Sequence, residues 1–287
     1  MYVCGQKKLI AKINDLISES SFPAFSIIIG GAGTGKKVLS EYISRKLNAE
    51  FIPCDISVDS VRNAIQESYI GNTGITRLFV FYDCDNMSVS AKNALLKVTE
   101  EPPKNTYFIM TACDISSMLP TVISRGTVFT IDQYTISDVY DFIEHYGSLK
   151  KITYTPEDID IMESVCTCPY DVILASKQNL KEVYDLADKF IQFIGASNLA
   201  NELKVTSMLN LKKDENGIDP ILFLRCVLLC CSKFIVSDII KEDAVIFDKI
   251  IRRTSKAIYE ITKKGSNKQI VLDNYIMNLH IDIAGGV

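Results

Sequence analysis

The chain has 287 residues, of which 47% are apolar and 23% are charged, and its formal net charge is −4. This composition is typical of a globular protein and is long enough for two or three domains. The acidic balance excludes a protein that binds nucleic acid through its overall charge, although a local basic face stays open.

The nine cysteines are irregularly spaced without a Cys-x-x-Cys pair, and the two histidines, His145 and His280, stand apart. This pattern favours buried, reduced thiols and predicts neither a metal site nor a disulfide framework. The first residues lack the apolar core of a secretory signal, and no apolar run reaches the ~18 residues of a membrane span. We therefore expect a cytoplasmic protein without a membrane partner.

Strands and helices alternate in the first 132 residues. Short apolar runs predict strands at 25–29, 51–52, 77–82, 107–111 and 128–131. Helical spacing of apolar residues predicts helices at 7–18, 37–47, 60–68 and 88–99. This alternation predicts an α/β domain with a parallel sheet and helices on both faces.

The rest of the chain is helical in pattern. The expected helices lie at 136–146, 156–165, 171–180, 186–194, 197–211, 220–236, 244–262 and 269–279. We predict three domains: an α/β domain at 1–132, a small helical domain at 133–182 and a helical C-terminal domain at 183–287.

Residues 30–37 read Gly-Gly-Ala-Gly-Thr-Gly-Lys-Lys, between a predicted strand and a predicted helix. This is the context of a phosphate loop, whose backbone N–H groups and helix N-terminus bind phosphate oxygens. The nucleotide-binding candidates in it are Gly30, Gly33, Thr34, Gly35, Lys36 and Lys37. The pattern needs Ser or Thr after the first lysine to hold Mg²⁺, and the ammonium group of Lys37 cannot ligate a cation. The alternative is a glycine-rich turn that binds nothing.

Residues 93–103 read Asn-Ala-Leu-Leu-Lys-Val-Thr-Glu-Glu-Pro-Pro. This run resembles the signature of clamp-loader AAA+ proteins, the family of the γ/τ and δ′ subunits of bacterial DNA polymerase III. Residues 119–125 are similar to the family's Leu-Pro…Ser-Arg-Cys stretch, with Gly126 in place of cysteine, and Gly5-Gln6 resembles its opening pair. The C-terminal segment 266–273 resembles the last collar helix. The resemblance is strong to residue 132 and looser beyond it.

The resemblance implies a RecA-like AAA+ domain, a helical lid and a helical collar for oligomerisation. Counting back from Asn93 places the family's Asp-Glu pair on Tyr82 and Asp83. Both protein groups that would organise Mg²⁺ are then replaced, by Lys37 and Tyr82. Asp83 is a weak candidate for the catalytic carboxylate, because it is one methylene shorter than Glu.

Further site residues follow from the same resemblance. Thr111 is the candidate sensor of the γ-phosphate, with Ala112 as the alternative. The segment 167–172, where ATPase members carry a lid arginine, contains none. Arg125 would reach ATP bound by an adjacent subunit as an arginine finger, or would be a surface arginine paired with a carboxylate. Lys92 and Lys97 are candidates for DNA phosphate contacts, or are two solvated lysines.

The sequence thus predicts a δ′-like clamp-loader subunit that lacks strong ATP hydrolysis of its own. Its partners would be ATPase subunits, a clamp-opening subunit, a sliding clamp and primer-template DNA. ATP or ADP would be bound weakly or as a structural ligand; Mg²⁺ stays open, and zinc is not expected. The alternatives are an active γ-like ATPase, a purely structural loader subunit, and an AAA+ protein of recombination or replication initiation, which the Glu-Glu-Pro-Pro run disfavours.

Overall fold

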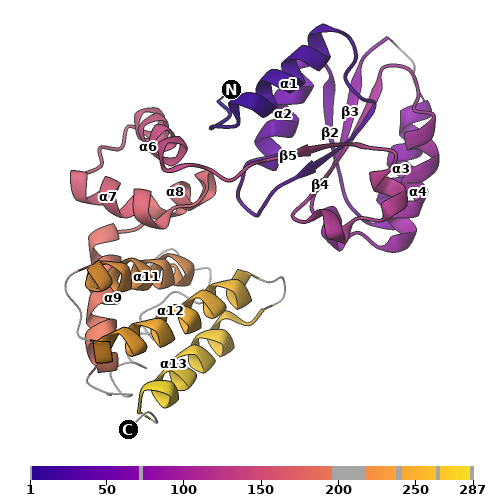
Figure 1. Ribbon diagram of the computed structural model, residues 1–287. Coiled ribbons are helices and arrows are strands. Elements are labelled where there is room, and N and C mark those ends of the chain that lie inside the picture. Colours follow the sequence, from indigo (N-terminus) through magenta and orange to yellow (C-terminus); the bar gives the residue numbers. More distant parts are fainter. Residues whose placement is uncertain (1, 71–73, 196–216, 237–240, 263–265, 285–287) are drawn as a thin grey trace. The chain divides into compact units, whose positions relative to one another are not determined.

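The computed structural model describes residues 2–70, 74–195, 217–236, 241–262 and 266–284 (Figure 1). The chain divides into two compact units, which are 1–138 with 168–170, and 139–167 with 171–287. The boundaries predicted at 132 and 182 stay a prediction, and the predicted helix 197–211 lies outside the described residues. None of the described helices has the length and apolar content needed to cross a membrane.

A five-stranded parallel sheet forms the centre of the first unit, in the order β2-β3-β4-β1-β5. The strands are β1 (Phe25–Ile29), β2 (Glu50–Cys54), β3 (Arg77–Phe81), β4 (Thr106–Ala112) and β5 (Thr127–Thr130). All strands run in one direction, so their carboxyl ends share one edge of the sheet and their amino ends share the other. The predicted parallel α/β domain is confirmed.

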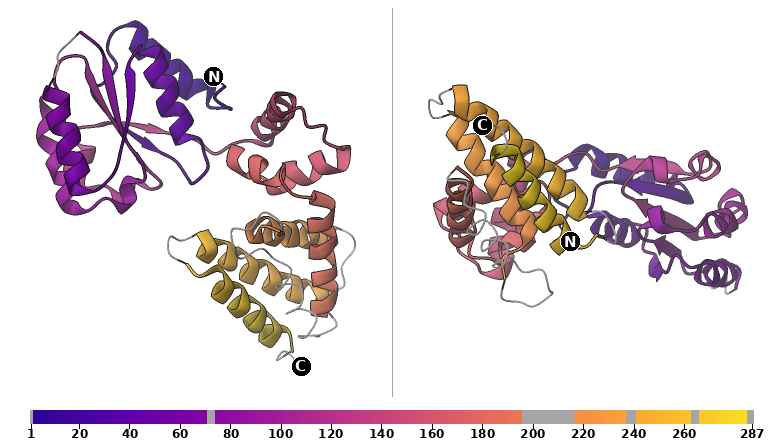
Figure 2. Two further views of the ribbon diagram at one scale, coloured as in Figure 1. Left: turned by 180° about the vertical axis from the view of Figure 1, so that it is seen from behind. Right: turned by 90° about the horizontal axis from the view of Figure 1, so that it is seen from below.

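Helices cover both faces of this sheet. Helices α1 (Lys7–Ser18) and α2 (Lys36–Lys46) lie on one face, and α3 (Val58–Tyr69) and α4 (Val89–Glu100) lie on the other (Figures 1 and 2). Successive side chains of a strand point to opposite faces. Accordingly, Ile28 of β1 joins the core under α1 and α2, while Ile27 joins the core under α3 and α4.

Local sequence signals explain several of these boundaries. The Ser88 side chain accepts a hydrogen bond from the backbone N–H of Ala91 and so caps α4, as expected. The predicted ranges 7–18 and 25–29 coincide with α1 and β1. The four-residue helix α5 (Pro120–Ile123) and two 3-10 turns, Cys84–Asn86 and Ile115–Ser117, were not expected from the sequence.

The second unit is helical where it is described. It contains most of α6 (Ile136–Lys150) and α8 (Pro169–Ala175), with α7 (Pro156–Val165), α9 (Leu180–Gly195), α11 (Pro220–Val236), α12 (Lys241–Thr262) and α13 (Lys268–Ala284). Helix α8 ends five residues before the predicted 180, because the chain turns at 176–179 before α9 begins. The Phe190 ring contacts Phe223 edge-on, with centroids 5.5 Å apart, which ties α9 to α11.

Candidate functional site

The phosphate loop joins the carboxyl end of β1 to the first turn of α2, as the sequence predicts. Gly33 and Gly35 have φ of +77° and +88°, a region that side chains with a Cβ rarely adopt. A Cβ on Gly30 would lie 2.8 Å from Thr34 Oγ1 and 3.0 Å from Ile131 Cβ. The glycines are therefore required by the shape of the loop, which presents the N-terminus of α2 at the sheet edge.

The Lys36 side chain is buried, and its ammonium group is held against the loop. Nζ donates hydrogen bonds to the carbonyl oxygens of Gly30 at 2.5 Å and Gly31 at 2.8 Å. Nζ also lies 3.6 Å from Cys113 Sγ, just beyond the end of β4. The predicted residues Gly30 to Lys36 are thus brought together, whereas Lys37 points into solvent.

The residue after β4 that reaches Lys36 is Cys113, and it was not among the predicted candidates. The Thr111 hydroxyl accepts a hydrogen bond from the backbone N–H of Asp83 at 3.2 Å, so Thr111 contacts the end of β3. The sequence left a choice between Thr111 and Ala112. The alternation of a strand puts residues 111 and 113 on the same side, and this signal was available in the sequence.

Two tyrosines and a cysteine lie against the loop from later parts of the chain. The Tyr134 hydroxyl donates a hydrogen bond to the Thr34 carbonyl at 2.7 Å. A Cβ on Gly33 would meet Tyr170 Cβ at 2.7 Å and Cys168 Sγ at 3.0 Å, and both residues belong to the same compact unit as the loop. The segment 167–172, which contains no arginine, therefore places the aromatic residue Tyr170 against the loop.

Tyr82 occupies the position at the end of β3 where the resemblance expects a metal-binding carboxylate. Its ring packs with the core under α1 and α2, and its buried hydroxyl finds no hydrogen-bond partner among the described residues. Burial, with a contribution from the Glu41 carboxylate on α2, raises the pKa of the phenol well above its ordinary value. The group is therefore a neutral phenol rather than an anionic ligand at neutral pH.

The two carboxylates that follow Tyr82 have different surroundings. Asp83 is exposed and has φ of +52°. Asp85 accepts hydrogen bonds from the backbone N–H groups of Cys113, at 2.8 Å, and Asp114, at 3.3 Å, and from the Ser117 hydroxyl at 2.7 Å. Burial works to raise the pKa of Asp85, but these bonds hold it below its ordinary value. Asp85 thus joins β3 to the turn after β4.

No group of three or more His, Cys, Asp or Glu side chains that could hold a metal ion occurs within the described ranges. The positions expected to serve Mg²⁺ carry an ammonium group at Lys37 and a phenol at Tyr82. A lysine offers donors alone, and a protonated phenol is a poor ligand for a hard cation. The residues of the loop therefore fit a phosphate group, while those at the metal position do not fit Mg²⁺.

Arg125 lies away from the loop, at the opposite edge of the sheet. It follows α5 and directly precedes β5, and a Cβ on its neighbour Gly126 would meet Phe25 at the start of β1. Arg125 Nε donates to Glu100 Oε1 at 2.6 Å, Nη2 forms an ion pair with the same oxygen at 2.5 Å, and Nη1 donates to the Thr121 carbonyl at 2.8 Å. Arg125 is thus paired with a carboxylate within this chain, and its role toward a neighbouring subunit stays a prediction.

The two lysines proposed for DNA contacts on α4 differ in exposure. Lys92 is buried, and its Nζ donates a hydrogen bond to the Ser117 carbonyl at 2.7 Å. Lys97 is exposed. The expectation of two lysines on one solvated face is thus wrong for Lys92, because its ammonium group anchors the turn after β4 instead of facing solvent.

An ion pair joins α8 and α11 within the second unit. Arg225 Nη1 lies 2.5 Å from Asp171 Oδ2 and donates to the Val165 carbonyl at 3.1 Å. The backbone N–H of Thr167 also donates to Asp171, at 2.8 Å. Burial works to raise the pKa of Asp171, but Arg225 and Thr167 hold it below the ordinary value. Asp171 directly follows residues 168–170, of which Cys168 and Tyr170 lie against the phosphate loop.

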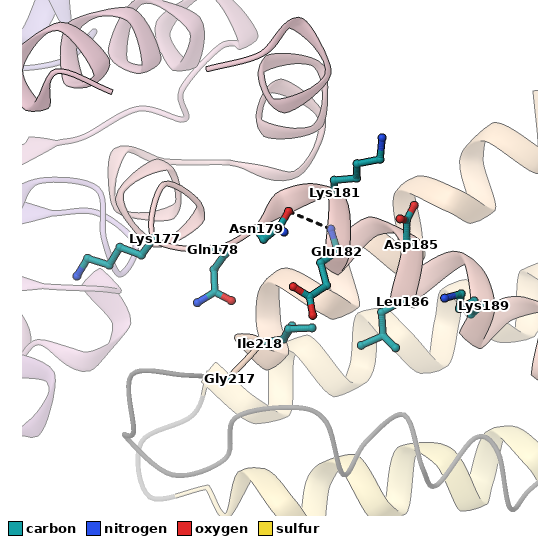
Figure 3. A pocket seen from close by; sticks show the side chains of 10 residues that line it. All are labelled: Lys177, Gln178, Asn179, Lys181, Glu182, Asp185, Leu186, Lys189, Gly217 and Ile218. Carbon is teal, nitrogen blue, oxygen red and sulfur yellow. Dashed lines mark hydrogen bonds between the residues drawn. The ribbon is translucent and has the colours of Figure 1, made fainter. Parts of the chain in front are cut away.

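A cavity of about 600 Å³ opens beside the start of α9 in the second unit (Figure 3). Asn179 caps this helix, since its side-chain oxygen accepts a hydrogen bond from the backbone N–H of Glu182 at 3.3 Å. The charged side chains that line the cavity are Lys177, Lys181, Lys189, Glu182 and Asp185. Both signs of charge are present, so the lining favours no single class of charged ligand.

A family model described as "DNA polymerase III, delta subunit" matches residues 16–135, which lie in the first unit. The DNA polymerase III subunit gamma of Buchnera aphidicola subsp. Schizaphis graminum is 23% identical over 172 residues, covering 50% of this chain and 47% of that protein. The DNA polymerase III subunit tau of Bacillus subtilis is 20% identical over 222 residues, covering 67% of this chain and 38% of that protein. The chain therefore spans half or less of the length of these relatives.

Among solved structures, the Thermotoga maritima RuvB Holliday junction branch migration motor superposes with a TM-score of 0.52 and 16% identity, covering 81% of this chain and 77% of that one. This likeness concerns the fold alone. The family match spans the five strands of the sheet, the phosphate loop and the Asn-Ala-Leu-Leu-Lys…Glu-Glu-Pro-Pro run described above. Residues 16–135 are therefore similar in sequence to subunits of DNA polymerase III, which supports the clamp-loader AAA+ resemblance over this part of the chain.

Proposed function

We propose that this chain is a δ′-like subunit of a DNA polymerase clamp loader, which offers Arg125 to ATP bound by a neighbouring subunit and hydrolyses little or no ATP itself. The observation that carries the proposal is the position of Arg125. It lies at the amino edge of a parallel sheet, whereas the chain's own phosphate loop follows the carboxyl end of β1. A guanidinium group at that edge is remote from the chain's own loop and is available to a neighbour.

The chain's own loop supports the second half of the proposal. In phosphoryl transfer Mg²⁺ neutralises much of the charge that develops on the phosphates. Lys37 and Tyr82 supply no anionic oxygen for that ion, and Asp85 is engaged with backbone N–H groups. Hydrolysis of ATP bound to this loop is therefore slow or absent.

Nucleotide binding without rapid turnover fits the same residues. Gly30, Gly33 and Gly35 give the loop its shape, and the N-terminus of α2 and the Lys36 ammonium group favour an anion there. The proposal therefore includes ATP or ADP held weakly, or as a structural ligand. Tyr134 and Tyr170 would exclude water from one side of that nucleotide's phosphates.

The proposed partners are the ATPase subunits, a clamp-opening subunit, the sliding clamp and primer-template DNA, and the proposed location is the cytoplasm. An arginine supplied by a neighbour stabilises transition-state charge and raises turnover by ~10³-fold or more. For DNA, the exposed Lys97 is the remaining candidate of the two lysines, through a salt-dependent phosphate contact.

An active γ-like ATPase is the second candidate function. It is favoured by the complete glycine loop with Lys36 and by the exposed carboxylate of Asp83 at the end of β3. In that case phosphates and water would hold the metal ion, and Asp83 would orient the attacking water.

The experiment compares DNA-stimulated ATP turnover of the loader assembled with its partner subunits, before and after Arg125→Ala. We expect turnover to fall by ~10³-fold. Arg62→Ala, an exposed arginine of α3 in the same unit, is the matched control and is expected to leave turnover unchanged. Unchanged turnover with Arg125→Ala would rule out the trans-acting role, and brisk turnover by the isolated chain that Lys36→Ala abolishes would favour the γ-like ATPase.

A further inference from the structure

The carboxylate of Glu100, the last residue of α4, fixes one side of the Arg125 guanidinium. A single oxygen, Glu100 Oε1, accepts a hydrogen bond from Nε at 2.6 Å and forms an ion pair with Nη2 at 2.5 Å. Charge-assisted hydrogen bonds of this kind are shorter and stronger than neutral ones. The pair joins two segments that are 25 residues apart in the chain.

A second anchor holds the other side of the same group. Arg125 Nη1 donates to the Thr121 carbonyl of α5 at 2.8 Å and lies 3.4 Å from the Ser124 hydroxyl. A guanidinium has five N–H groups in one plane. Nε and Nη1 donate hydrogen bonds, whereas the contact recorded for Nη2 within the described part of the chain is its ion pair with Glu100. The N–H groups of Nη2 are therefore the donors left for an incoming anion.

The Arg125–Glu100 ion pair is exposed to solvent, so we expect it to orient the guanidinium more than it stabilises the fold. The Arg125 side chain is 33% exposed and the Glu100 side chain is 50% exposed. Ion pairs so open to solvent contribute little to the free energy of unfolding, because water and salt screen them. An arginine held in one conformation, however, loses less side-chain entropy when it contacts a ligand.

We infer that Glu100 is a positioning residue for Arg125, which keeps the guanidinium in the orientation that a neighbouring subunit's phosphate meets. The inference rests on the proposed function. Glu100 stays hydrogen-bonded to Nε, while the N–H groups of Nη2 contact the phosphate oxygen. Glu100 itself touches no nucleotide.

The charge of Glu100 has two opposite effects on the neighbour's turnover, and the direction of the observed change tells which one dominates. A carboxylate beside the guanidinium weakens its attraction for phosphate, whereas fixed orientation strengthens their contact in the transition state. If orientation dominates, removal of the Glu100 charge slows the neighbour's turnover. If charge compensation dominates, the same substitution speeds it up.

The test uses the loader assembled with its partner ATPase subunits and compares Glu100→Gln with Glu101→Gln. The second variant makes the same change of charge at the next residue, which is exposed. We expect Glu100→Gln to lower kcat for ATP by about tenfold with KM for ATP little changed. Glu101→Gln is expected to match the wild type, and the thermal unfolding of both variants is expected to be that of the wild type.

A double variant separates action through Arg125 from any other effect. In an Arg125→Ala background, Glu100→Gln is expected to cause no further loss, because the group it positions is absent. A further loss in the double variant, a rise in kcat with Glu100→Gln, or equal effects of Glu100→Gln and Glu101→Gln would each overturn the inference.

The same set of variants distinguishes this inference from the proposed function. If Arg125→Ala lowers turnover and Glu100→Gln does not, the arginine acts in trans without help from Glu100. If Arg125→Ala leaves turnover unchanged, the proposed function fails, and the positioning role fails with it.

Discussion

The phosphate loop and the end of β3, the two parts of the proposed nucleotide site, differ in how well their residues fit a phosphate group and a metal ion. The phosphate loop at the end of β1 keeps glycines at positive φ and a buried lysine, and later residues pack directly on it. At the end of β3, where the resemblance expects a metal-binding carboxylate, stands Tyr82, and Asp85 joins this end of the sheet to the turn after β4. Both ends lie on the same edge of the sheet.

The difference shows which parts of a site the fold itself maintains. The loop shape is coupled to packing, since Gly33 contacts the turn 168–170, and a change there disturbs the first unit. A metal ligand at the end of a strand contributes little to packing, so its replacement by a phenol leaves the sheet intact. A loop that fits phosphate beside a strand end that does not fit Mg²⁺ is the combination expected from this difference in packing.

The largest effect is expected from Gly33→Ala in the loop. The new Cβ would lie 2.7 Å from Tyr170 Cβ, which cannot move without the backbone, and φ of +77° is itself strained for alanine. We expect a loss of about 2–3 kcal/mol in the free energy of unfolding, measured by thermal and denaturant unfolding. Gly31→Ala is the matched control, because its nearest contact would be an ordinary 3.6 Å to Thr34 Cγ2. Equal stability of the two variants would contradict the coupling.

A smaller loss is expected from Asp85→Asn at the end of β3. The amide loses the charge that accepts the hydrogen bonds of Cys113, Asp114 and Ser117, which costs about 1–2 kcal/mol at neutral pH. The folded-state pKa of Asp85 is lowered, so its stabilisation is complete above the unfolded value of 3.8 and is lost as the pH falls through the folded value. The gap between variant and wild type should therefore narrow in acid.

Asp83→Asn is the control for this pH series, because asparagine also tolerates the left-handed conformation at φ of +52°. At neutral pH its unfolding free energy should match that of the wild type, because the Asp83 side chain is exposed. A gap for Asp85→Asn that widens in acid would mean that the hydrogen bonds do not favour the charged form.

The paired substitution Lys37→Thr and Tyr82→Asp tests whether the residues at these two positions prevent Mg²⁺ from strengthening the binding of ATP. A hydroxyl and a carboxylate would then stand at the two positions that Mg²⁺ uses beside a phosphate loop. We compare ATP affinity with Mg²⁺ to ATP affinity with a chelator. The ratio of these affinities is expected to be about tenfold larger in the variant than in the wild type, equal to about 1.4 kcal/mol. Lys37→Thr with Tyr82→Asn lacks the carboxylate and should gain less. No dependence on Mg²⁺ in the first variant would mean that the register assigned to Tyr82 is wrong.

Periodicity and capping signals predicted most of the first unit. The helix 7–18 and the strand 25–29 were predicted at their observed bounds, because their apolar spacing and their flanking Pro and Gly residues are local signals. The segment 168–170, at the start of α8, could not be placed against the loop from the sequence. Its contact with the loop depends on the path of the chain through α6 and α7, and no local pattern encodes a contact across 135 residues.

The sequence names candidate residues of the site but not the contacts that they make. The loop and Arg125 follow from motifs, but the pairing of Arg125 with Glu100 needed the spatial meeting of α4 and α5. Lys92 has the same residue type as Lys97 on the same helix, and its burial depends on the turn at Ser117, which the sequence did not reveal. Cys113 was missed because a thiol is not an expected partner for the loop lysine.

The smallest effect is expected from Tyr82→Phe, which removes only the hydroxyl. That oxygen is buried and has no hydrogen-bond partner within the described ranges, so it carries a desolvation cost in the folded state. We expect the free energy of unfolding to rise by up to about 1 kcal/mol, and nucleotide affinity to stay the same with or without Mg²⁺. The matched variant is Tyr134→Phe, whose hydroxyl donates to the Thr34 carbonyl and whose loss should instead lower stability. A loss of Mg²⁺-dependent affinity in Tyr82→Phe would mean that the phenol oxygen serves the ion after all, and the contrast between the two ends of the site would then disappear.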